Sequence, residues 1–309
     1  MPQDILCIGA AHVDRKAGAK AEIQLGTSIP VSSHHTLGGV ARNVAENLVR
    51  LHCPTALISR IGNDAAGNWV HAHSSDLGLD VTGLTRSPAQ ATASYTALLD
   101  PNGEMVLGLA DMDIYDELTP DALDEIPDSL FERPLWFLDT NLPQATLQAL
   151  LEKRSASTRI FVDPVSCPKA HKLLGLLNGI DFLFPNRDEA EILSGLQIRT
   201  EADLHRAAHL LHQRGVKNVL ITLGESGVYV SGEELSSGTM FPALPASVAD
   251  VTGAGDALIA GFLYSYGQTQ SLEHAVETGI IAATLTIQSA ETVHPDLSPA
   301  LLDSLRTSN

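Results

Sequence analysis

Asp250-Val251-Thr252-Gly253-Ala254-Gly255-Asp256 is the stretch that decides the fold, and an apolar run from Ala257 to Leu263 follows it at once. Gly253 and Gly255 permit a tight backbone path, so successive N–H groups can point into one concavity at a helix start. The helix dipole adds to this nest, which suits a phosphate or the charge developing on one. Asp256 falls in the first turn beside it. A carboxylate in this place predicts a base that takes a hydroxyl proton during phosphoryl transfer. The alternative is an ordinary helix capped by Thr252.

The composition limits the partners of the protein. The chain has 309 residues, which fits one large α/β domain with an appendage. Apolar residues make up 44% and charged residues 18%, enough for a continuous core and against wholesale disorder. The net charge of −18 predicts that the surface repels nucleic acid and anionic lipid. An anionic substrate such as ATP then needs backbone N–H groups and a divalent metal such as Mg²⁺.

The cysteines and the start of the chain indicate a cytoplasmic protein. Cys7, Cys53 and Cys167 are scattered and form no C-x-x-C pair, which predicts reduced thiols and gives no support for structural zinc. No basic region precedes the apolar segment 5–11, so we expect no signal peptide. No apolar run reaches the ~18 residues that a membrane helix needs.

The first apolar segment, Ile5–Ala10, predicts a buried strand that leads to Asp14. Open α/β sheets bind ligands at the carboxyl ends of their strands, and an acid there can accept hydrogen bonds from sugar hydroxyls. A loop cap is the alternative role. The strand lacks the G-x-G-x-x-G of a dinucleotide site, and the chain has no G-x-x-x-x-G-K-[ST] phosphate loop.

Two β-like regions predict a small sheet that stands off the main one. Asp100-Pro101-Asn102-Gly103 is strong turn chemistry for a hairpin. We expect a lid formed by about 15–36 and 91–112 that excludes water from a site, the alternative being a decorative edge hairpin. The expected strand segments are 23–25, 29–31, 93–99 and 104–109.

A pair of glycines opens the first predicted helix. Gly38 and Gly39 let a ligand approach the backbone closely, and Asn43, one turn later, can direct its amide toward the same ligand. Val44 and Leu48 follow at helical spacing as a core stripe.

Strands and helices alternate regularly from Leu135 onward, which predicts a parallel sheet with helices on both faces. The expected strands are 135–139, 159–165, 181–184, 219–223 and 227–231. The expected helices are 143–154, 168–178, 187–194, 201–214, 271–288 and 298–306. Polar residues at or just beyond strand ends predict an active-site rim: Asn141, Asp163, Asn186 and Thr222.

Two segments of this rim suit a nucleotide and its metal. Asn186 and Glu189 stand three apart at a helix start, where they can hold hydrated magnesium, directly or through water, or simply cap the helix. Thr222, Gly224 and Gly227 provide a hydroxyl and flexible backbone for the phosphates or ribose of a nucleotide. His205, His209 and His212 share a helix face, but no acid or cysteine completes a zinc site, so we expect a structural role.

Three motifs in order resemble the ribokinase-like (PfkB) carbohydrate and nucleoside kinases over nearly the whole chain. They are Gly38-Gly39-x-x-x-Asn43, Asn186-x-x-Glu189 and Asp250-x-Thr252-Gly253-Ala254-Gly255-Asp256. The resemblance implies one kinase domain over 1–309, a three-layer α/β/α sandwich with a central, mostly parallel sheet and a small β-sheet lid. His12 is a departure, because family members often carry Asn before the x-Asp pair.

Within the family, the chain is most similar to the branch that phosphorylates pseudouridine. The similarity rests on residues 38–43, 111–114, 161–166 and 295–298. It implies in-line transfer of the γ-phosphoryl group of Mg–ATP to the 5′-hydroxyl of pseudouridine. Another family kinase, acting on ribose, adenosine or a different nucleoside, is the alternative. A non-catalytic sensor and an NAD-linked dehydrogenase are further rivals, which the intact 253–256 stretch and the missing glycine fingerprint disfavour.

The resemblance also assigns roles residue by residue. Asp256 is the base, which needs no raised pKa, and Gly253, Ala254 and Gly255 hold the charge of the migrating phosphoryl group. Asp14, Gly38, Gly39, Asn43 and Asn141 bind the acceptor, with Asp111 and Lys169 as further candidates. Asn186 and Glu189 position Mg–ATP; Thr222, Gly224 and Gly227 line the nucleotide; Asp250 and Thr252 suit K⁺.

Two structural expectations follow from these roles. The Asp256 carboxylate must lie close to the turn that carries Asn43. A homodimer through the lid sheets is expected, with Ile23 and Leu25 at the interface.

Overall fold

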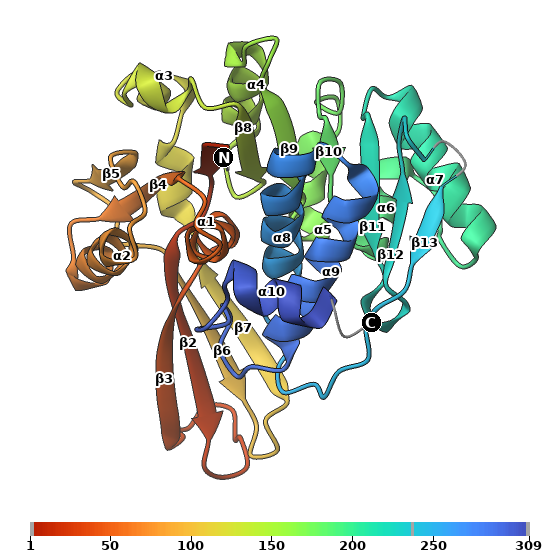
Figure 1. The fold of residues 1–309 in the computed structure, drawn as a ribbon. Helices are drawn as coiled ribbons and strands as arrows, with labels where there is room; N and C mark the ends of the chain where they lie inside the picture. The colour runs from red at the N-terminus through yellow and green to blue at the C-terminus, as the bar shows by residue number, and fades with distance from the viewer. Residues whose placement is uncertain (1–2, 236–237, 307–309) are drawn as a thin grey trace.

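The computed structural model describes residues 3–235 and 238–306. A nine-stranded sheet forms its centre, in the order β13-β12-β11-β10-β9-β8-β1-β4-β5 (Figure 1). The strands from β11 to β5 in this order are parallel to their neighbours, whereas β12 and β13 are antiparallel. Their bounds are β1 Ile5–Ile8, β4 Thr55–Gly62, β5 Leu84–Ser87, β8 Leu135–Asp139, β9 Arg159–Asp163, β10 Phe182–Leu183, β11 Asn218–Thr222, β12 Val228–Ser231 and β13 Thr239–Phe241.

Helices cover both faces of the sheet because its central strands are apolar on both sides. In β1, Leu6 and Ile8 pack into one cluster while Ile5 and Cys7 pack into the other. One face carries α1 Val40–Arg50, α2 Ala65–Asp76, α8 Ala254–Thr269 and α9 Leu272–Ile287, with α10 Pro299–Arg306 outside α9. The other carries α3 Pro120–Leu123, α4 Gln144–Lys153, α5 Cys167–Ala170, α6 Arg187–Ser194 and α7 Glu201–Gln213. The predicted α/β/α sandwich is confirmed.

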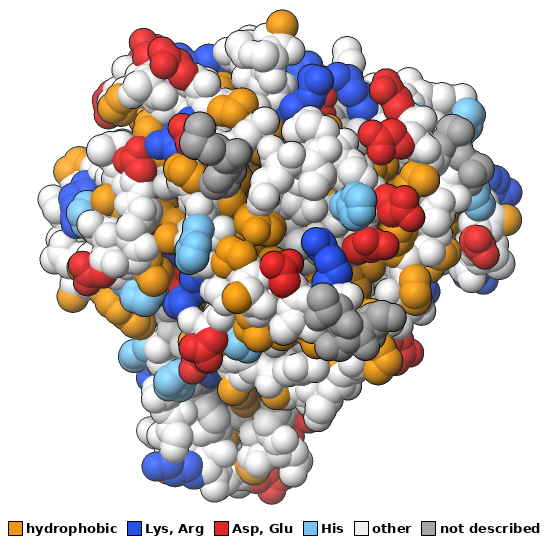
Figure 2. Space-filling view, in the orientation of Figure 1, with side chains coloured by type: hydrophobic (Ala, Val, Ile, Leu, Met, Phe, Trp, Pro, Cys, Tyr) orange, Lys and Arg blue, Asp and Glu red, His pale blue; other side chains and the backbone are white. Residues whose placement is uncertain are grey.

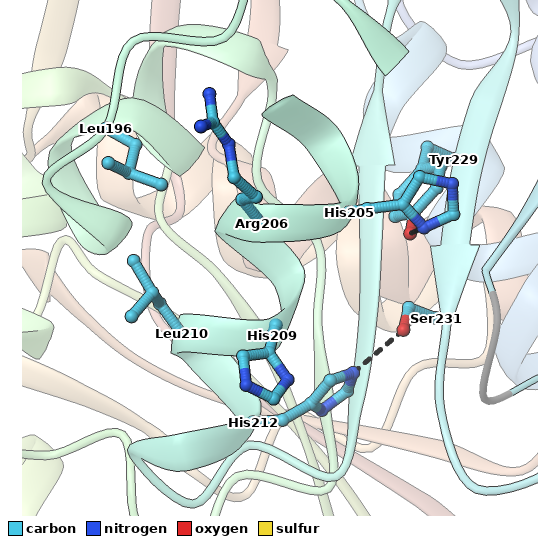
Figure 3. A pocket seen from close by; sticks show the side chains of 8 residues that line it. All are labelled: Leu196, His205, Arg206, His209, Leu210, His212, Tyr229 and Ser231. Atoms are coloured by element: carbon cyan, nitrogen blue, oxygen red, sulfur yellow. Dashed lines mark hydrogen bonds between the residues drawn. The ribbon is translucent and has the colours of Figure 1, made fainter. Parts of the chain in front are cut away.

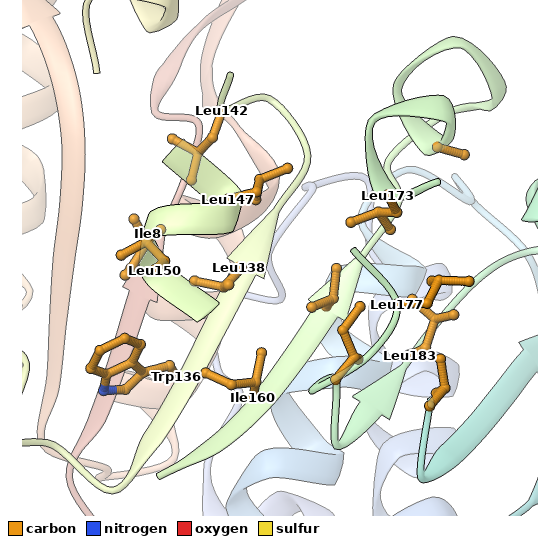
Figure 4. Close-up of a cluster of buried hydrophobic side chains, with 14 of the residues drawn as sticks. Ile8, Trp136, Leu138, Leu142, Leu147, Leu150, Ile160, Leu173, Leu177 and Leu183 are labelled. Carbon is orange, nitrogen blue, oxygen red and sulfur yellow. The ribbon is translucent and has the colours of Figure 1, made fainter. Parts of the chain in front are cut away.

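The core holds the elements that carry polar side chains at the sheet edge. On the α4 face, Trp136 and Leu138 of β8 pack against Leu147 and Leu150 (Figure 4). On the opposite face, Phe161 and Phe182 stack with ring centroids 4.6 Å apart, and Phe262 of α8 packs on both rings. This packing anchors α8 to the centre of the sheet.

A second sheet, of four strands in the order β3-β2-β6-β7, projects from the main body (Figure 1). Its strands are β2 His12–Ala19, β3 Val31–Gly38, β6 Ser94–Leu99 and β7 Met105–Asp111. The predicted hairpin turn joins β6 to β7, where the Asp100 carboxylate accepts hydrogen bonds from the backbone of Asn102 at 2.8 Å and Glu104 at 2.9 Å. We call this four-stranded sheet the lid.

Three of the predicted segments differ from the structure. Residues 23–25 and 29–31 do not form separate strands: the chain turns between β2 and β3, with Gly26 at φ 80° and Leu25 95% exposed. The expected helix over 168–178 shortens to α5 and a 3-10 turn at His171–Leu173 (η3). Leu174 then turns extended and Gly175 has a φ of 90°, which ends the helical path.

Three smaller observations complete the description. Cys7, Cys53 and Cys167 are free thiols, and burial raises the pKa of Cys53 to about 12. Acidic and basic side chains are intermixed on the face shown in Figure 2. Among the described residues, no helix combines the length and the apolarity that crossing a bilayer requires.

Candidate active site

Polar side chains gather where parallel strands end. β8, β9, β10 and β11 are neighbours, and Asp139 at the end of β8 pairs in register with Asp163 at the end of β9. Asn186 forms a parallel bridge with Thr222, which ends β11. The four rim residues predicted from the sequence therefore follow adjacent strands at the same edge of the sheet.

The start of α8 leaves its first N–H groups without a side-chain cap among the described residues. Gly253, the N-cap residue, has a φ of 82°, and a Cβ there would collide with the carbonyl oxygen of Thr292. Gly255 is different, because a Cβ there would meet no described heavy atom within 4 Å. Thr252 does not cap the helix: its hydroxyl donates to the Asp250 carboxylate at 2.6 Å. The N–H of Ala254 donates to the carbonyl of Val251 over a long 3.3 Å, and no side chain of the described residues caps the helix start, which leaves it open to an anion.

Asp256 lies directly against the first helix. Its Oδ2 accepts a hydrogen bond from Asn43 Nδ2 at 2.7 Å, although 213 positions separate the two residues. Arg42 Nη2 donates to Asn43 Oδ1, which fixes the amide with its NH₂ group toward Asp256. Burial raises the pKa of Asp256 to about 7, and the Asn43 hydrogen bond opposes that rise. The carboxyl group therefore titrates near neutral pH, which the sequence did not lead us to expect.

Asp139 organises the centre of the site, and the sequence interpretation gave it no role. It is fully buried, and its Oδ2 accepts hydrogen bonds from Ala10 N at 2.8 Å and Ala41 N at 3.0 Å. Its Oδ1 accepts from the backbone and side chain of Asn141, both at 2.9 Å. Asp139 thereby joins the ends of β1 and β8 to the start of α1. An acid that ends a buried strand two residues before Asn141 is the signal that could have revealed it.

The predicted acceptor residues Asp14, Gly38 and Gly39 meet where the lid joins α1. Asp14 lies in β2, and a Cβ on Gly38 would occupy the place of its carboxylate. Gly39, with a φ of 100°, comes so close to the carbonyl of Ala10 that a side chain there would clash. Both positions thus require glycine, because neighbouring atoms lie too close to the backbone to leave room for a side chain.

Asn141 and Lys169 contact each other directly. Lys169 Nζ donates to Asn141 Oδ1 at 2.5 Å, and burial lowers the pKa of the lysine. Lys172, which was not predicted, donates to the backbone carbonyls of Thr140 at 3.0 Å and Leu142 at 2.9 Å. Asp111 is exposed at the end of β7 and pairs with Ser94, which in turn pairs with Val13 in β2.

Asn186 and Glu189 close the start of α6 with a capping box. Asn186 Oδ1 accepts from Glu189 N, and Glu189 Oε2 accepts from Asn186 N, both at 2.9 Å. Burial raises the pKa of Glu189. Among the described residues no cluster of three His, Cys, Asp or Glu side chains is arranged for a metal. The pair therefore offers oxygen ligands of the kind that Mg²⁺ prefers, but each residue already commits one oxygen to the cap.

The predicted nucleotide residues surround the turn between β11 and β12. Thr222 ends β11, and Gly224 begins the 3-10 turn Gly224–Ser226 (η4) with a φ of 59°. Gly227, at φ 94°, packs against the backbone of β13, where a Cβ would meet Phe241 O. Gly227 is thus held by strand packing, while a Cβ on Gly224 would meet no described atom within 4 Å.

The Asp250 carboxylate, a candidate K⁺ ligand, already has two partners. Lys16 of the lid strand β2 donates to Oδ2 at 2.7 Å, and Thr252 donates to Oδ1 through its backbone N–H and its hydroxyl. Lys16 and the hydrogen bonds from Thr252 hold the pKa of Asp250 at about 2, against the effect of burial. The ion pair links the lid to the loop before α8.

The three histidines of α7 line a separate cavity of about 550 Å³ (Figure 3). His212 Nε2 lies 2.9 Å from Ser231 Oγ, and His205 Nδ1 lies 2.8 Å from Tyr229 Oη. Ser231 pairs with Val219 near the start of β11, whereas Thr222 at its other end pairs with Val228. The cavity is therefore displaced from the carboxyl edge that carries the rim residues.

Comparisons with known proteins identify the class to which this fold belongs. The model of the pfkB family of carbohydrate kinases matches residues 2–299. Pseudouridine kinase of Escherichia coli (strain K12) is 32% identical over 97% of this chain and 96% of its own length. A solved carbohydrate kinase from Agrobacterium tumefaciens superimposes with a TM-score of 0.85 at 32% identity, covering 98% of this chain and 96% of the other.

A ribokinase of Arabidopsis thaliana, solved with ribose and ATP, shares the fold alone. Its TM-score is 0.84 at 22% identity, and the match covers 98% of this chain and 99% of the other. Because the family model matches nearly the whole chain, this chain belongs to the pfkB carbohydrate kinases. It is a carbohydrate or nucleoside kinase of that family.

Proposed function

We propose that this protein transfers the γ-phosphoryl group of ATP to the 5′-hydroxyl of pseudouridine, forming pseudouridine 5′-phosphate and ADP. The observation that carries the proposal is the 2.7 Å contact of Asn43 with Asp256 beside the uncapped start of α8. A buried carboxylate and a helix start without a side-chain cap then share one place, as a base and an anion cradle must. The choice of pseudouridine is supported by the 32% identity to the Escherichia coli enzyme.

In the proposed mechanism, Asp256 accepts the hydroxyl proton as the new P–O bond forms. Gly253, Ala254 and Gly255 donate backbone N–H groups to the charge on the migrating phosphoryl group. Asp14, Gly38, Gly39 and Asn43 hold the ribose, with Asn141, Lys169 and Asp111 as further acceptor contacts. Positioning and charge stabilisation supply most of the rate acceleration, since phosphoryl transfer asks little covalent help of the protein.

The proposed nucleotide contacts are Thr222, Gly224, Gly227 and Asn186. Mg²⁺ would neutralise phosphate charge, and Glu189 with Asn186 would hold it through water, because one oxygen of each already serves the cap. Asp250 and Thr252 are proposed as ligands of K⁺, in competition with the Lys16 ammonium on Asp250 Oδ2.

An acceptor panel tests the proposal. ADP release is measured with pseudouridine, ribose, adenosine and other nucleosides, and the phosphorylated product is identified by mass spectrometry. We expect kcat/KM for pseudouridine to exceed the others by about 100-fold or more, an energy difference that a few specific hydrogen bonds can supply. A preference for ribose or adenosine refutes the choice of acceptor and leaves the class intact. No ADP release with any acceptor refutes the kinase mechanism.

We also propose a homodimer through the lid. Four apolar side chains of the edge strand β7 are between 50% and 62% exposed: Met105, Val106, Leu107 and Leu109. An exposed apolar edge strand of this kind can pair with a strand of another chain. Light scattering should give a dimer mass for the wild type and a monomer mass for Leu107→Asp with Leu109→Asp. Ile23→Asp with Leu25→Asp, in the loop between β2 and β3, tests the contact expected from the sequence, and Leu174→Asp, at a 40% exposed position outside the lid, is the control. A dimer mass retained by both lid variants refutes an interface through the lid.

A further inference from the structure

The departure at His12 is part of a hydrogen-bonded row that ends on Asp14. His12 Nδ1 lies 3.3 Å from Tyr115 Oη, and His12 Nε2 lies 3.1 Å from Asp14 Oδ1. All three residues are largely enclosed: Tyr115 is 1% exposed, and the side chains of His12 and Asp14 are 11% and 22% exposed. His12 and Asp14 stand two apart in β2, so they lie on the same face of the lid strand.

The row fixes which nitrogen of His12 carries the hydrogen. Tyr115 Oη accepts a hydrogen bond from the backbone N–H of Ala11 at 2.9 Å, so the phenol hydrogen points elsewhere. Among the contacts of the described residues, His12 Nδ1 is the acceptor within reach of that hydrogen. In the neutral imidazole, one nitrogen accepts and the other donates. Nδ1 therefore accepts from Tyr115, and Nε2–H donates to Asp14.

Asp14 is confined from two sides as a result. His12 holds one carboxylate oxygen, and the space left by the missing Cβ of Gly38 receives the other. Gly38 is the register partner of His12 across the β2–β3 pair. The hydrogen bond from His12 and the space at Gly38 therefore act on Asp14 from one pair of facing residues in the lid. A carboxylate with a fixed rotamer loses less entropy when it binds a hydroxyl than a free one.

We propose that His12 is a positioning residue, which orients the Asp14 carboxylate toward the hydroxyl groups of the acceptor, and that Tyr115 sets the imidazole tautomer for this task. The inference rests on the proposed function, in which Asp14 binds the acceptor. It predicts that the N–H at Nε2 of His12 contributes to binding of the nucleoside substrate. The lone pair at Nδ1 contributes only indirectly, through its hydrogen bond with Tyr115.

Two amide variants separate the nitrogens. His12→Gln places an NH₂ group where Nε2–H lies, whereas His12→Asn reaches only the position of Nδ1. Hydrogen bonds to charged groups contribute enough for about a tenfold change in binding. We expect His12→Asn and His12→Leu to raise the KM for the acceptor by about tenfold and to leave the KM for ATP within about twofold. His12→Gln should remain within about threefold of the wild type for both.

Spectroscopy supplies a readout independent of turnover. Nitrogen-15 NMR of the imidazoles, with His12 assigned by its loss in His12→Gln, should show the Nε2–H tautomer in the wild type. Tyr115→Phe should give a mixture of tautomers and raise the KM for the acceptor by a smaller factor than His12→Leu. Thermal unfolding of each variant checks that the native fold is retained.

The outcomes distinguish this inference from the proposed function. Equal acceptor KM values for His12→Gln and His12→Asn, or an Nδ1–H tautomer in the wild type, overturn the inference while turnover persists. If the wild type turns over another nucleoside, the same variants are compared on that acceptor. If it turns over none, calorimetric binding of pseudouridine to the same variants decides, and absence of binding to the wild type overturns both proposals.

Discussion

The helix starts of α6 and α8 serve the same sheet edge, but the N–H groups at the two starts are used differently. At α6, Asn186 and Glu189 satisfy each other's backbone N–H groups. At α8, Thr252 turns away to Asp250, and the first acid, Asp256, reaches across to Asn43. A self-capped helix start stabilises the fold, whereas an uncapped one keeps its donors for a ligand. The five predictions that follow test this difference.

The largest effect is expected from removing the carboxylate of α8. Asp256→Asn should lower kcat by about three orders of magnitude or more, because no other group accepts the hydroxyl proton, while ATP binding is retained. Steady-state ADP release and calorimetry with ATP measure the two quantities. The amide is nearly isosteric, so the fold should persist, as circular dichroism can check. A kcat within tenfold of the wild type would falsify the assignment of Asp256 as the base.

Two glycines of the α8 start should respond differently to the same added methyl group. Gly255→Ala should lower kcat by about 10- to 100-fold with little change in Tm, because its Cβ enters open space where we place the phosphoryl group. Gly253→Ala should instead lower Tm, since it combines a φ of 82° with a clash at Thr292 O.

Thermal unfolding and single-turnover kinetics on both variants make the comparison. Similar losses of Tm for the two would mean that Gly255 is constrained by packing rather than by a ligand. An unchanged kcat in Gly255→Ala would remove the anion cradle from the mechanism.

Asn43→Leu should move the pH dependence of the enzyme to higher pH. The hydrogen bond from Asn43 lowers the pKa of Asp256, which burial raises to about 7. Without that bond the pKa rises further, so kcat/KM, which follows the ionised base in the free enzyme, should increase only at a higher pH than in the wild type. The pH–rate profile with ADP release measures this, and a profile that shifts to lower pH contradicts the role of Asn43.

Stability should depend on the same group with a definite sign. The pKa of Asp256 is about 7 in the folded protein and 3.8 in its ordinary state, so the folded form binds the proton more tightly. Its contribution to stability is full below about pH 4 and is lost as the pH rises through 7. Asp256→Asn should therefore flatten the dependence of Tm on pH across this window.

The comparison of α6 and α8 also explains what the sequence could reveal. Glycine spacing and an acid at the start of an apolar run are local, so the α8 start could be predicted, and so could the alternation of strands and helices. The partner of Asp256 follows from the family order of motifs. Asp139 was missed because two of its four hydrogen bonds come from Ala10 and Ala41, about 100 or more positions away, and only the two from Asn141 are local to the strand end.

The elevated pKa of Asp256 could not be predicted from the sequence either, because the burial of its carboxyl group depends on how the lid, α1 and α8 pack together. The two short strands expected between Lys20 and Val31 failed for a related reason. Their apolar residues alternate weakly, and the real strands, β2 and β3, are built from polar positions such as Ser32, Ser33 and His34. Pairing with a neighbouring strand, rather than local apolarity, decides the extent of a lid strand.

The smallest effect, and the finest test of the comparison, concerns Glu189. Glu189→Gln keeps an oxygen that can accept from Asn186 N, so the capping box and the Tm should be retained. The variant loses the charge, and if α6 also helps to hold Mg²⁺ through water, the Mg²⁺ concentration for half-maximal ADP release should rise by about three- to tenfold. Asn186→Ala is the matched variant, since it removes the cap and should cost about 1 kcal/mol of stability. A wild-type Mg²⁺ response in Glu189→Gln would restrict the α6 start to its capping role and leave α8 as the helix start that contacts the phosphates.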